Sequence, residues 1–390
     1  MKYNFDEIIN RKDTNSVKYD VGDDILPMWI ADMDFKVCPK VLQAIQKRLD
    51  NGILGYSTIP PSFYQSISSF YKRRHNVEIP CEDIIFVTGV VPSISSMVRR
   101  LTHPNEYVIL LTPTYNIFFN SIINNGARPL ESALVFNEDH YEIDFDDLEE
   151  KMKNTQSTLM ILCNPANPTG TIYTKEDLSR IAMLAYKYNV KVISDEIHCE
   201  LVDPSYKYVP FYSVSEIAKD ISITCLSPSK VFNIAGLQGA AVVCHNPFLR
   251  HQINRGFNND EIAEPNAFVI QAIESCYNEC DDYIDELRAY IQHNKEYAYS
   301  YIEKEISDLK VVHSHATYLL WVDISSLSSN SVEFCSFLKE NARLFVSEGR
   351  EYHGDGYHHI RINIACPKSI VMEGLKRLKE GVRLYKELHK

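Results

Sequence analysis

Short runs of apolar, mostly β-branched residues alternate with helical patterns between about positions 81 and 244. Runs this short and this apolar are typical of strands that are buried on both faces of a parallel sheet. The segment 175–189 shows the expected helical partner, because its apolar positions share one face and Glu176 and Asp177 lie in its opening turn. The pattern therefore predicts an α/β domain with a largely parallel sheet. The expected strands are 84–87, 107–111, 158–162, 190–194, 222–226 and 240–244.

The pattern changes after Pro265. A long, charged helical stretch reaches about Glu305, and the strand-like runs LKVV, YLLWV, RLFVS and HHIRINI follow, with one helical segment among them and a terminal helix after them. This order indicates a separate α+β unit. The first fifty residues, with a helix opening near Pro39, do not follow the sheet pattern and are expected to pack onto that unit. We predict two closely joined domains, a large one at 51–284 and a small one built from 1–50 and 285–390.

Composition narrows the class of protein. No apolar run reaches the length of a membrane span, and the N-terminus lacks the apolar stretch of a secretory signal, so the cytoplasm is the expected location. The net charge is −12, and the Lys and Arg residues are dispersed along the chain. Because nucleic-acid binding needs a basic stripe or patch, the pattern argues against it. The expected partner is a small molecule.

The ten cysteines are scattered and mostly lie in apolar runs. This distribution is typical of reduced thiols in a core and unlike a disulfide framework. No CxxC pair is present, and no set of four Cys, His or acidic ligands assembles by spacing alone. We therefore predict that the protein holds no metal.

Lys230 follows the expected strand 222–226 within the sequence SPSKVFNIAGLQ. Hydroxyl-bearing, small and apolar residues surround it. A lysine in such a place is partly desolvated, which favours the neutral amine and suits a nucleophile that forms a Schiff base. The alternative interpretation is a surface lysine in a loop.

Two further polar segments follow buried strands. The sequence CNPANPTG at 163–170 forces a rigid, non-helical turn at the carboxyl end of its strand, where parallel sheets bind ligands. Asp195 ends the next expected strand, where a carboxylate is costly unless it meets a cation such as a protonated pyridine nitrogen. An ordinary β-to-α connection and a cap for the following turn are the respective alternatives.

The sequence TGVVPS at 88–93 joins another expected strand to a helix. Pro92 suits the first position of that helix. Backbone amides at the start of a helix have no partner within the helix, and together with the hydroxyls of Ser227 and Ser229 they can hold a phosphate dianion.

These four signals in this order, with Arg361 in HHIRINIACP, resemble the fold type I superfamily of pyridoxal phosphate enzymes, which includes the aspartate aminotransferases. The sequences LPMWIADMDF at 26–35, PTYNIFF at 113–119, SDEIHCEL and SPSKVFNIAGLQ, with Gly55-Tyr56, resemble the MalY/PatB-type cystathionine β-lyase (C-S lyase) family more specifically. The resemblance covers essentially the whole chain. It implies an aspartate aminotransferase-like α/β fold with a mostly parallel seven-stranded sheet, a smaller α+β domain and a homodimer.

The resemblance also implies a role for each matching residue. Lys230 would form the Schiff base with pyridoxal 5'-phosphate, Asp195 would pair with the pyridine nitrogen, and Asn167 would hydrogen-bond the phenolic oxygen. Arg361 would bind the carboxylate of an amino acid substrate through its planar fork. The other cofactor contacts would come from Tyr115 stacked on the ring, from His198, from the Val90 and Val91 amides, from Ser227 and Ser229, and from Tyr56 of the partner subunit.

Two departures from the transaminase pattern bear on the reaction. Gln238 stands where transaminases commonly have arginine, and His198 where they commonly have tyrosine, and the lyase branch shares both. Within that branch, Tyr352-His353 replaces a usual Phe-Gly pair. We expect a lyase that converts L-cystathionine or a related S-substituted cysteine to a thiol, pyruvate and ammonia. An aminotransferase acting on an amino acid, or a regulatory protein that retains the cofactor, is the alternative.

Overall fold

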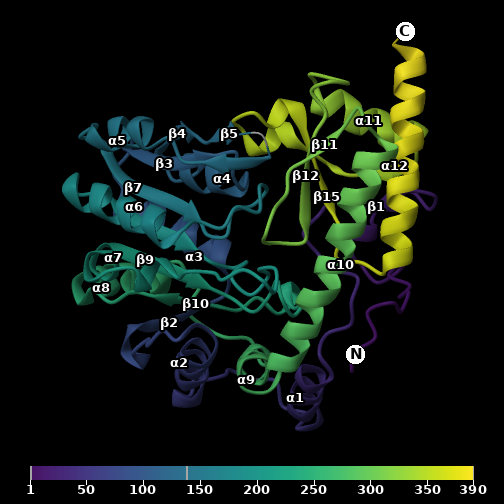
Figure 1. Ribbon diagram of the computed structural model, residues 1–390. Helices are drawn as coiled ribbons and strands as arrows, with labels where there is room; N and C mark the ends of the chain where they lie inside the picture. The colour runs from purple at the N-terminus through teal and green to yellow at the C-terminus, as the bar shows by residue number, and fades with distance from the viewer. Residues whose placement is uncertain (1, 138, 390) are drawn as a thin grey trace.

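The computed structural model describes residues 2–137 and 139–389, which form two main sheets of unequal size with helices around them (Figure 1). The larger sheet has seven strands: β2 (Ile84–Val87), β3 (Tyr107–Thr112), β4 (Arg128–Ala133), β7 (Ser157–Cys163), β8 (Lys191–Asp195), β9 (Ser222–Leu226) and β10 (Ala240–Val243). Their order is β2-β10-β9-β8-β7-β3-β4. All neighbouring pairs are parallel except the two that include β10. The predicted α/β fold with a mostly parallel sheet is confirmed.

Both faces of this sheet are buried, which explains its uninterrupted apolar runs. In β3, Val108 and Leu110 join the apolar cluster on one face, and Ile109 and Leu111 join the cluster on the other. The first face is covered by α3 (Val90–Leu101), α4 (Ile117–Ile123) and α8 (Pro247–Asn259), and the second by α5 (Phe145–Lys153), α6 (Lys175–Lys187) and α7 (Glu216–Ile221). Because these helices cover the two faces, they leave the carboxyl ends of the parallel strands uncovered.

The helix predicted at 175–189 is α6. Thr174 caps it: the Thr174 hydroxyl accepts the Asp177 amide at 3.1 Å, and the Asp177 carboxylate accepts the Thr174 amide at 3.0 Å. This reciprocal pair satisfies two amides that the helix itself leaves unpaired. Its buried residues include Leu178, Ile181 and Ala185 of the predicted face.

The smaller sheet is antiparallel and belongs to the C-terminal part of the chain. Its order is β11-β12-β15-β14, with β11 (Lys310–Val311), β12 (Leu319–Asp323), β14 (Ser347–Glu348) and β15 (His359–Asn363). Helices α10 (Asp281–Glu305), α11 (Ser331–Asn341) and α12 (Lys368–Leu388) pack against it. Two short pairs complete the strands, a parallel one between β1 (Leu26–Pro27) and β13 (Leu344–Phe345) and a hairpin of β5 (Val135–Asn137) and β6 (His140–Glu142).

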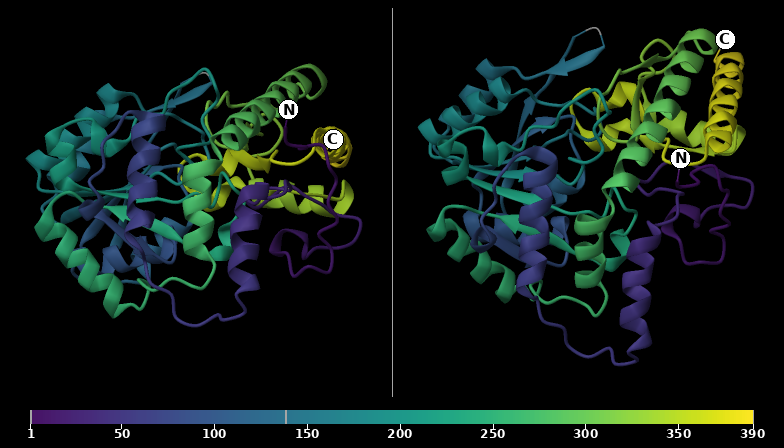
Figure 2. Two further views of the ribbon diagram at one scale, coloured as in Figure 1. Left: turned by 90° about the horizontal axis from the view of Figure 1, so that it is seen from below. Right: turned by 60° about the horizontal axis from the view of Figure 1, so that its bottom comes forward.

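The N-terminal fifty residues contact elements of both parts of the structure, the one around the larger sheet and the one around the smaller sheet. Strand β1 pairs with β13 beside the smaller sheet. Helix α1 (Pro39–Asp50) instead packs along α9 (Val269–Glu279), and α9 also packs against α2 (Pro61–His75) (Figures 1 and 2). The expectation that this segment packs onto the second unit therefore describes only part of it. The domain boundaries at 51–284 remain a prediction.

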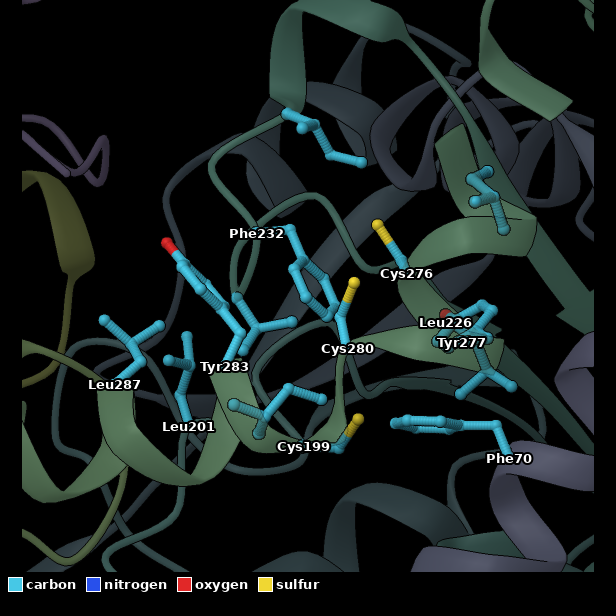
Figure 3. Packing of buried hydrophobic residues seen from close by; sticks show 14 of the residues in the cluster. Phe70, Cys199, Leu201, Leu226, Phe232, Cys276, Tyr277, Cys280, Tyr283 and Leu287 are labelled. Carbon is cyan, nitrogen blue, oxygen red and sulfur yellow. The ribbon is translucent and has the colours of Figure 1, made fainter. Parts of the chain in front are cut away.

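The helical stretch expected up to Glu305 is two helices rather than one. Cys280 leaves the helical conformation with φ −120° and ψ 24°, and Asp281 and Asp282 open α10 with the acidic first turn that favours a helix start. Figure 3 shows this junction inside an apolar cluster, where Cys276, Cys280 and Tyr283 lie beside Phe232. All ten cysteines are free, and all but Cys81 are buried, so the interpretation as core thiols is confirmed. Within the described residues, no helix is long and apolar enough to cross a membrane.

Gly349 and Gly356 bring two short 3-10 turns, Gly349–Tyr352 and Gly356–His358, into backbone contact next to β15. A Cβ on Gly356 would lie 2.0 Å from the Gly349 carbonyl oxygen, and a Cβ on Gly349 would lie 2.2 Å from the His359 carbonyl oxygen. These neighbours are backbone atoms and cannot turn aside as a side chain could.

We therefore expect Gly356→Ala to lower the free energy of unfolding by about 3 kcal/mol, because the added methyl forces the two turns apart. Urea unfolding of the cofactor-free protein measures it. Gly22→Ala is the control, since the nearest atom there is the tip of the Ile25 side chain at 3.3 Å. Equal stability of the two variants would contradict this view of the turns.

Candidate active site

A cavity of about 930 Å³ lies at the carboxyl ends of the parallel strands. Parallel α/β sheets bind ligands at this edge. Residues of the N-terminal segment and of β15 complete its wall. Every site residue predicted from the sequence except Tyr56 lines it: Val90, Val91, Tyr115, Asn167, Asp195, His198, Ser227, Ser229, Lys230 and Arg361.

Lys230 extends into this cavity from the turn that follows β9. The Ser227 hydroxyl shapes the turn by donating to the Gly239 carbonyl at 2.8 Å and accepting the Ser229 amide at 3.2 Å. The Lys230 Nζ donates to the Ala31 carbonyl at 2.8 Å. Burial lowers the pKa of Lys230 to about 8, and the positive charge of Arg361 acts in the same direction. A large fraction of the amine is therefore neutral near pH 8.

This shift predicts how the cofactor-free protein takes up an aldehyde. Only the neutral amine reacts, so the rate of covalent attachment of pyridoxal phosphate should rise about tenfold per pH unit below pH 8 and then level off. Borohydride trapping followed by mass spectrometry measures the rate. Nα-acetyl-lysine amide is the control, because its rate keeps rising towards pH 10. A protein rate that also rises to pH 10 would contradict the lowered pKa.

Asp195, the last residue of β8, and His198, three residues further on, lie on one wall of the cavity. Asp195 is buried and accepts the Ile197 amide at 3.1 Å, and burial raises its pKa to about 6. Burial lowers the pKa of His198 to about 3, so its imidazole is neutral at pH 7. Among the described residues, the buried His198 Nδ1 has no hydrogen-bond partner. A cation facing Asp195 and a polar group facing His198 would satisfy both side chains.

The start of α3 offers amides to an anion. Val90 and Val91 are its first two residues, with Gly89 before them, so their N–H groups have no partner within the helix. The prediction that Pro92 takes the first helical position is wrong, since it is the third residue of α3. Proline fits there because the first turn needs no donor from it and its φ is already helical. The shift leaves both predicted valine amides at the helix start.

Arg361 lies in the middle of β15 and is buried beside Asn167. Its two terminal nitrogens donate to Asn167 Oδ1 at 3.1 Å and to the Trp29 carbonyl at 2.9 Å, with the Ser347 hydroxyl at 3.4 Å. Among the described residues, its Nε has no partner. A guanidinium with a spare donor at a cavity wall suits a planar carboxylate.

The Tyr352-His353 pair, where this chain departs from the lyase branch, contacts Arg361 through Tyr352. The guanidinium carbon is 4.8 Å from the centre of the buried Tyr352 ring, so the aromatic face supports the cation. His353 has φ 61° and ψ −161°, a conformation that normally requires glycine, and its ring stacks on Phe119 at 3.6 Å. His353 therefore adopts the backbone conformation that a glycine at this position would adopt.

The two predicted tyrosines differ in their surroundings. Tyr115 follows β3 and lines the cavity, with the Phe118 ring edge-on at 5.6 Å. Tyr56 is fully exposed in the segment between α1 and α2 and does not line the cavity of its own chain. Within a single chain, the structure does not bring Tyr56 to the other site residues.

The structure adds one element that the sequence analysis did not assign to the site. Residues 29–35, called the strap segment below, contact both Lys230 and Arg361. The Ala31 carbonyl accepts from Lys230, and the Trp29 carbonyl accepts from Arg361. The signal that could have revealed it is a pair of acidic residues, Asp32 and Asp34, within an otherwise apolar run.

Two asparagines from distant parts of the chain hold the strap segment. The Asn233 amide nitrogen donates to the Met33 and Phe35 carbonyls at 2.8 and 3.1 Å. The Asn363 amide nitrogen donates to the Ile30 and Asp32 carbonyls at 2.6 and 2.8 Å. Since Asn233 lies in the Lys230 turn and Asn363 ends β15, the strap segment is tied to both cation-bearing elements.

These groups fit pyridoxal 5'-phosphate. Lys230 is an amine that reacts with an aldehyde near neutral pH, Asp195 is a buried carboxylate in need of a cation, and α3 begins with free amides for a phosphate. The unpartnered His198 Nδ1 supplies a further polar contact. Arg361 remains for a carboxylate.

Comparison with known proteins agrees with this fit. The family model "Aminotransferase class I and II" matches residues 23–378. Cystathionine beta-lyase PatB of Bacillus subtilis (strain 168) is 35% identical over 385 residues, covering 97% of this chain and 100% of that protein. Cystalysin from Treponema denticola, solved with pyridoxal 5'-phosphate, superposes with a TM-score of 0.95 at 31% identity, covering 98% and 99% of the two chains.

A second solved structure extends the likeness. The C-S lyase from Staphylococcus hominis, bound to the same cofactor, superposes with a TM-score of 0.92 at 30% identity, and 98% of each chain is covered. The family match, these relatives and the fit of the cavity lead to one conclusion. The chain belongs to the class I and II aminotransferase family, as a pyridoxal phosphate enzyme of the cystathionine β-lyase and C-S lyase group.

Proposed function

We propose that this enzyme cleaves the Cβ–S bond of L-cystathionine or a related S-substituted L-cysteine, releasing a thiol, pyruvate and ammonia. The observation that carries the proposal is the convergence of Lys230, Asp195 and Arg361 on one cavity. Such a cavity can receive an amino acid by its amino and carboxyl groups, with space left for a sulfur substituent. Relatives named as C-S lyases support the choice of bond.

Each residue has a distinct task in this proposal. Arg361 binds the substrate carboxylate and so orients the Cα–H bond, and Lys230 removes that proton as general base. When bound, the cofactor supplies an electron sink for the charge left at Cα. Asp195 would hold the ring nitrogen of the cofactor in its protonated form, because a buried carboxylate stays ionised only opposite a cation. Asn167 contacts Arg361 at 3.1 Å and orients it towards the substrate.

An assay that follows pyruvate and free thiol together tests the proposal. Purified enzyme with cofactor and L-cystathionine should release both in equal amounts, and ammonia with them. Transfer of the amino group from the substrate to an added 2-oxo acid, with no thiol released, would instead support an aminotransferase. That outcome would overturn the lyase proposal and leave the cofactor assignment intact.

We also propose a homodimer in which Tyr56 of the partner subunit contacts the cofactor phosphate. Tyr56 is fully exposed, and the neighbouring Ile53 and Leu54 are exposed as well. An apolar surface of this kind is suited to a subunit interface. The expected site then takes Lys230 from one chain and Tyr56 from the other.

Mixing two impaired variants tests the shared site. Tyr56→Ala and Lys230→Ala should each have little activity alone, whereas refolding them together should restore about a quarter of the native activity, because half the dimers are mixed and each has one intact site. Analytical ultracentrifugation reports the dimer. Absence of any recovery in mixed dimers would show that Tyr56 serves its own chain or none.

A further inference from the structure

Four charged side chains meet where the strap segment passes the mouth of the cavity. Arg11 donates to Asp32 Oδ2 at 2.7 Å and to Asp34 Oδ1 at 2.8 Å, and Lys18 donates to Asp34 Oδ2 at 2.8 Å. Both oxygens of Asp34 are thus paired with cations. Lys18 and Asp34 are buried, with 1% and 7% of their side chains exposed, so this half of the cluster is closed.

Asp32 differs from Asp34 in having an oxygen to spare. Within the described residues, Arg11 is the only side chain that pairs with it, and it does so at Oδ2 alone. Its side chain is 30% exposed and lines the same cavity as Lys230 and Arg361. Arg11 cannot readily turn to a ligand, because its terminal nitrogens also donate to the Met33 carbonyl and the Ser16 hydroxyl. The available group is therefore an anion.

The position of Asp32 relates it to the reacting end of the substrate. It follows Ala31, whose carbonyl accepts from Lys230 at 2.8 Å. Burial and the Arg361 charge lower the pKa of Lys230, and Asp32 opposes them more strongly than Asp195 does. Asp32 is thus close enough to act on the amine, yet it lies on the N-terminal wall, whereas Asp195 lies at the end of β8.

We propose that Asp32 is a specificity-determining residue that receives a positively charged group, an ammonium, on the sulfur substituent of the substrate. The free Oδ1 accepts the ammonium while Oδ2 stays on Arg11, and a substituent whose only charged group is a carboxylate is repelled. The inference rests on the proposed C-S lyase activity. It makes the preferred substrates S-substituted cysteines with a distal amine, a class that includes those ending in a second amino acid.

Three substrates of similar length test the inference: S-(2-aminoethyl)-L-cysteine, S-propyl-L-cysteine and S-carboxymethyl-L-cysteine. They differ chiefly in the charge of the substituent, and each would release pyruvate. The native enzyme should have the highest kcat/KM for the aminoethyl substrate and the lowest for the carboxymethyl substrate. In Asp32→Asn, the ratio of kcat/KM for aminoethyl over propyl should fall about five- to tenfold, a moderate effect because solvent screens this partly exposed carboxylate.

Asp20→Asn is the matched control, because Asp20 is exposed on the same N-terminal segment and does not line the cavity. It should keep the native substrate ratios. Cleavage of all three substrates with the same ratios in Asp32→Asn and native enzyme would overturn the inference alone. Absence of pyruvate from every substrate would overturn the proposed function and the inference with it. The charge preference of the native enzyme is a test that needs no variant, and its absence would also overturn the inference.

Discussion

Replacing Lys230 with alanine is expected to lower the rate of pyruvate release by at least about 10⁴-fold, because one side chain serves as the covalent attachment point and as the base at Cα. The structure supports so large an effect. Lys230 is largely buried, its pKa is lowered to about 8, and it lies in one cavity with Asp195 and Arg361. The coupled pyruvate assay at saturating L-cystathionine measures it.

Lys175→Ala is the control, since Lys175 is exposed at the start of α6 and should leave the rate unchanged. Mass spectrometry after borohydride reduction provides a second measurement. The native chain should gain the mass of one reduced cofactor, and Lys230→Ala should gain none. Covalent labelling of the variant, or a rate within tenfold of native, would show that a different amine carries the reaction.

The strands of the larger sheet could be predicted because burial on both faces leaves them almost wholly apolar. β4 was not predicted, because it lacks this burial on both faces. It lies at the edge of the sheet, its residues RPLESA are mostly exposed or half-exposed, and no apolar run marks it. The antiparallel direction of β10 was also not predicted, since an apolar run gives no sign of which way its strand lies in the sheet.

The site could be predicted where a charged or reactive side chain lies at or just after the end of a strand. Asp195 and Lys230 stand at or just beyond strand ends, and that local order is enough to bring them to one edge. The strap segment gave no comparable signal, because its place depends on remote contacts. Ala31 meets Lys230 across 199 positions, and Asn363 meets Ile30 across 333. Only the folded chain reveals Asp32 as part of the cavity wall.

Replacing Arg361 with lysine is expected to lower kcat/KM for S-ethyl-L-cysteine about 10³-fold, mainly through KM. A lysine presents a point charge in place of the planar fork that suits a carboxylate. It would also leave the Asn167 Oδ1 or the Trp29 carbonyl oxygen without the donor that the guanidinium now supplies at 3.1 and 2.9 Å. Release of ethanethiol, followed with a thiol reagent, measures the loss.

A substrate without the carboxylate, 2-(ethylthio)ethylamine, isolates the interaction. The native enzyme should release ethanethiol from it far more slowly than from S-ethyl-L-cysteine, and Arg361→Lys should change that slow rate by less than about tenfold. Arg383→Lys is the control, because Arg383 is an exposed residue of α12 paired with Glu380. If Arg361→Lys slowed both substrates equally, Arg361 would support the cavity wall through Asn167 and the strap segment, and the carboxylate would bind elsewhere. Loss confined to the carboxylate substrate would instead assign the binding of that group to Arg361.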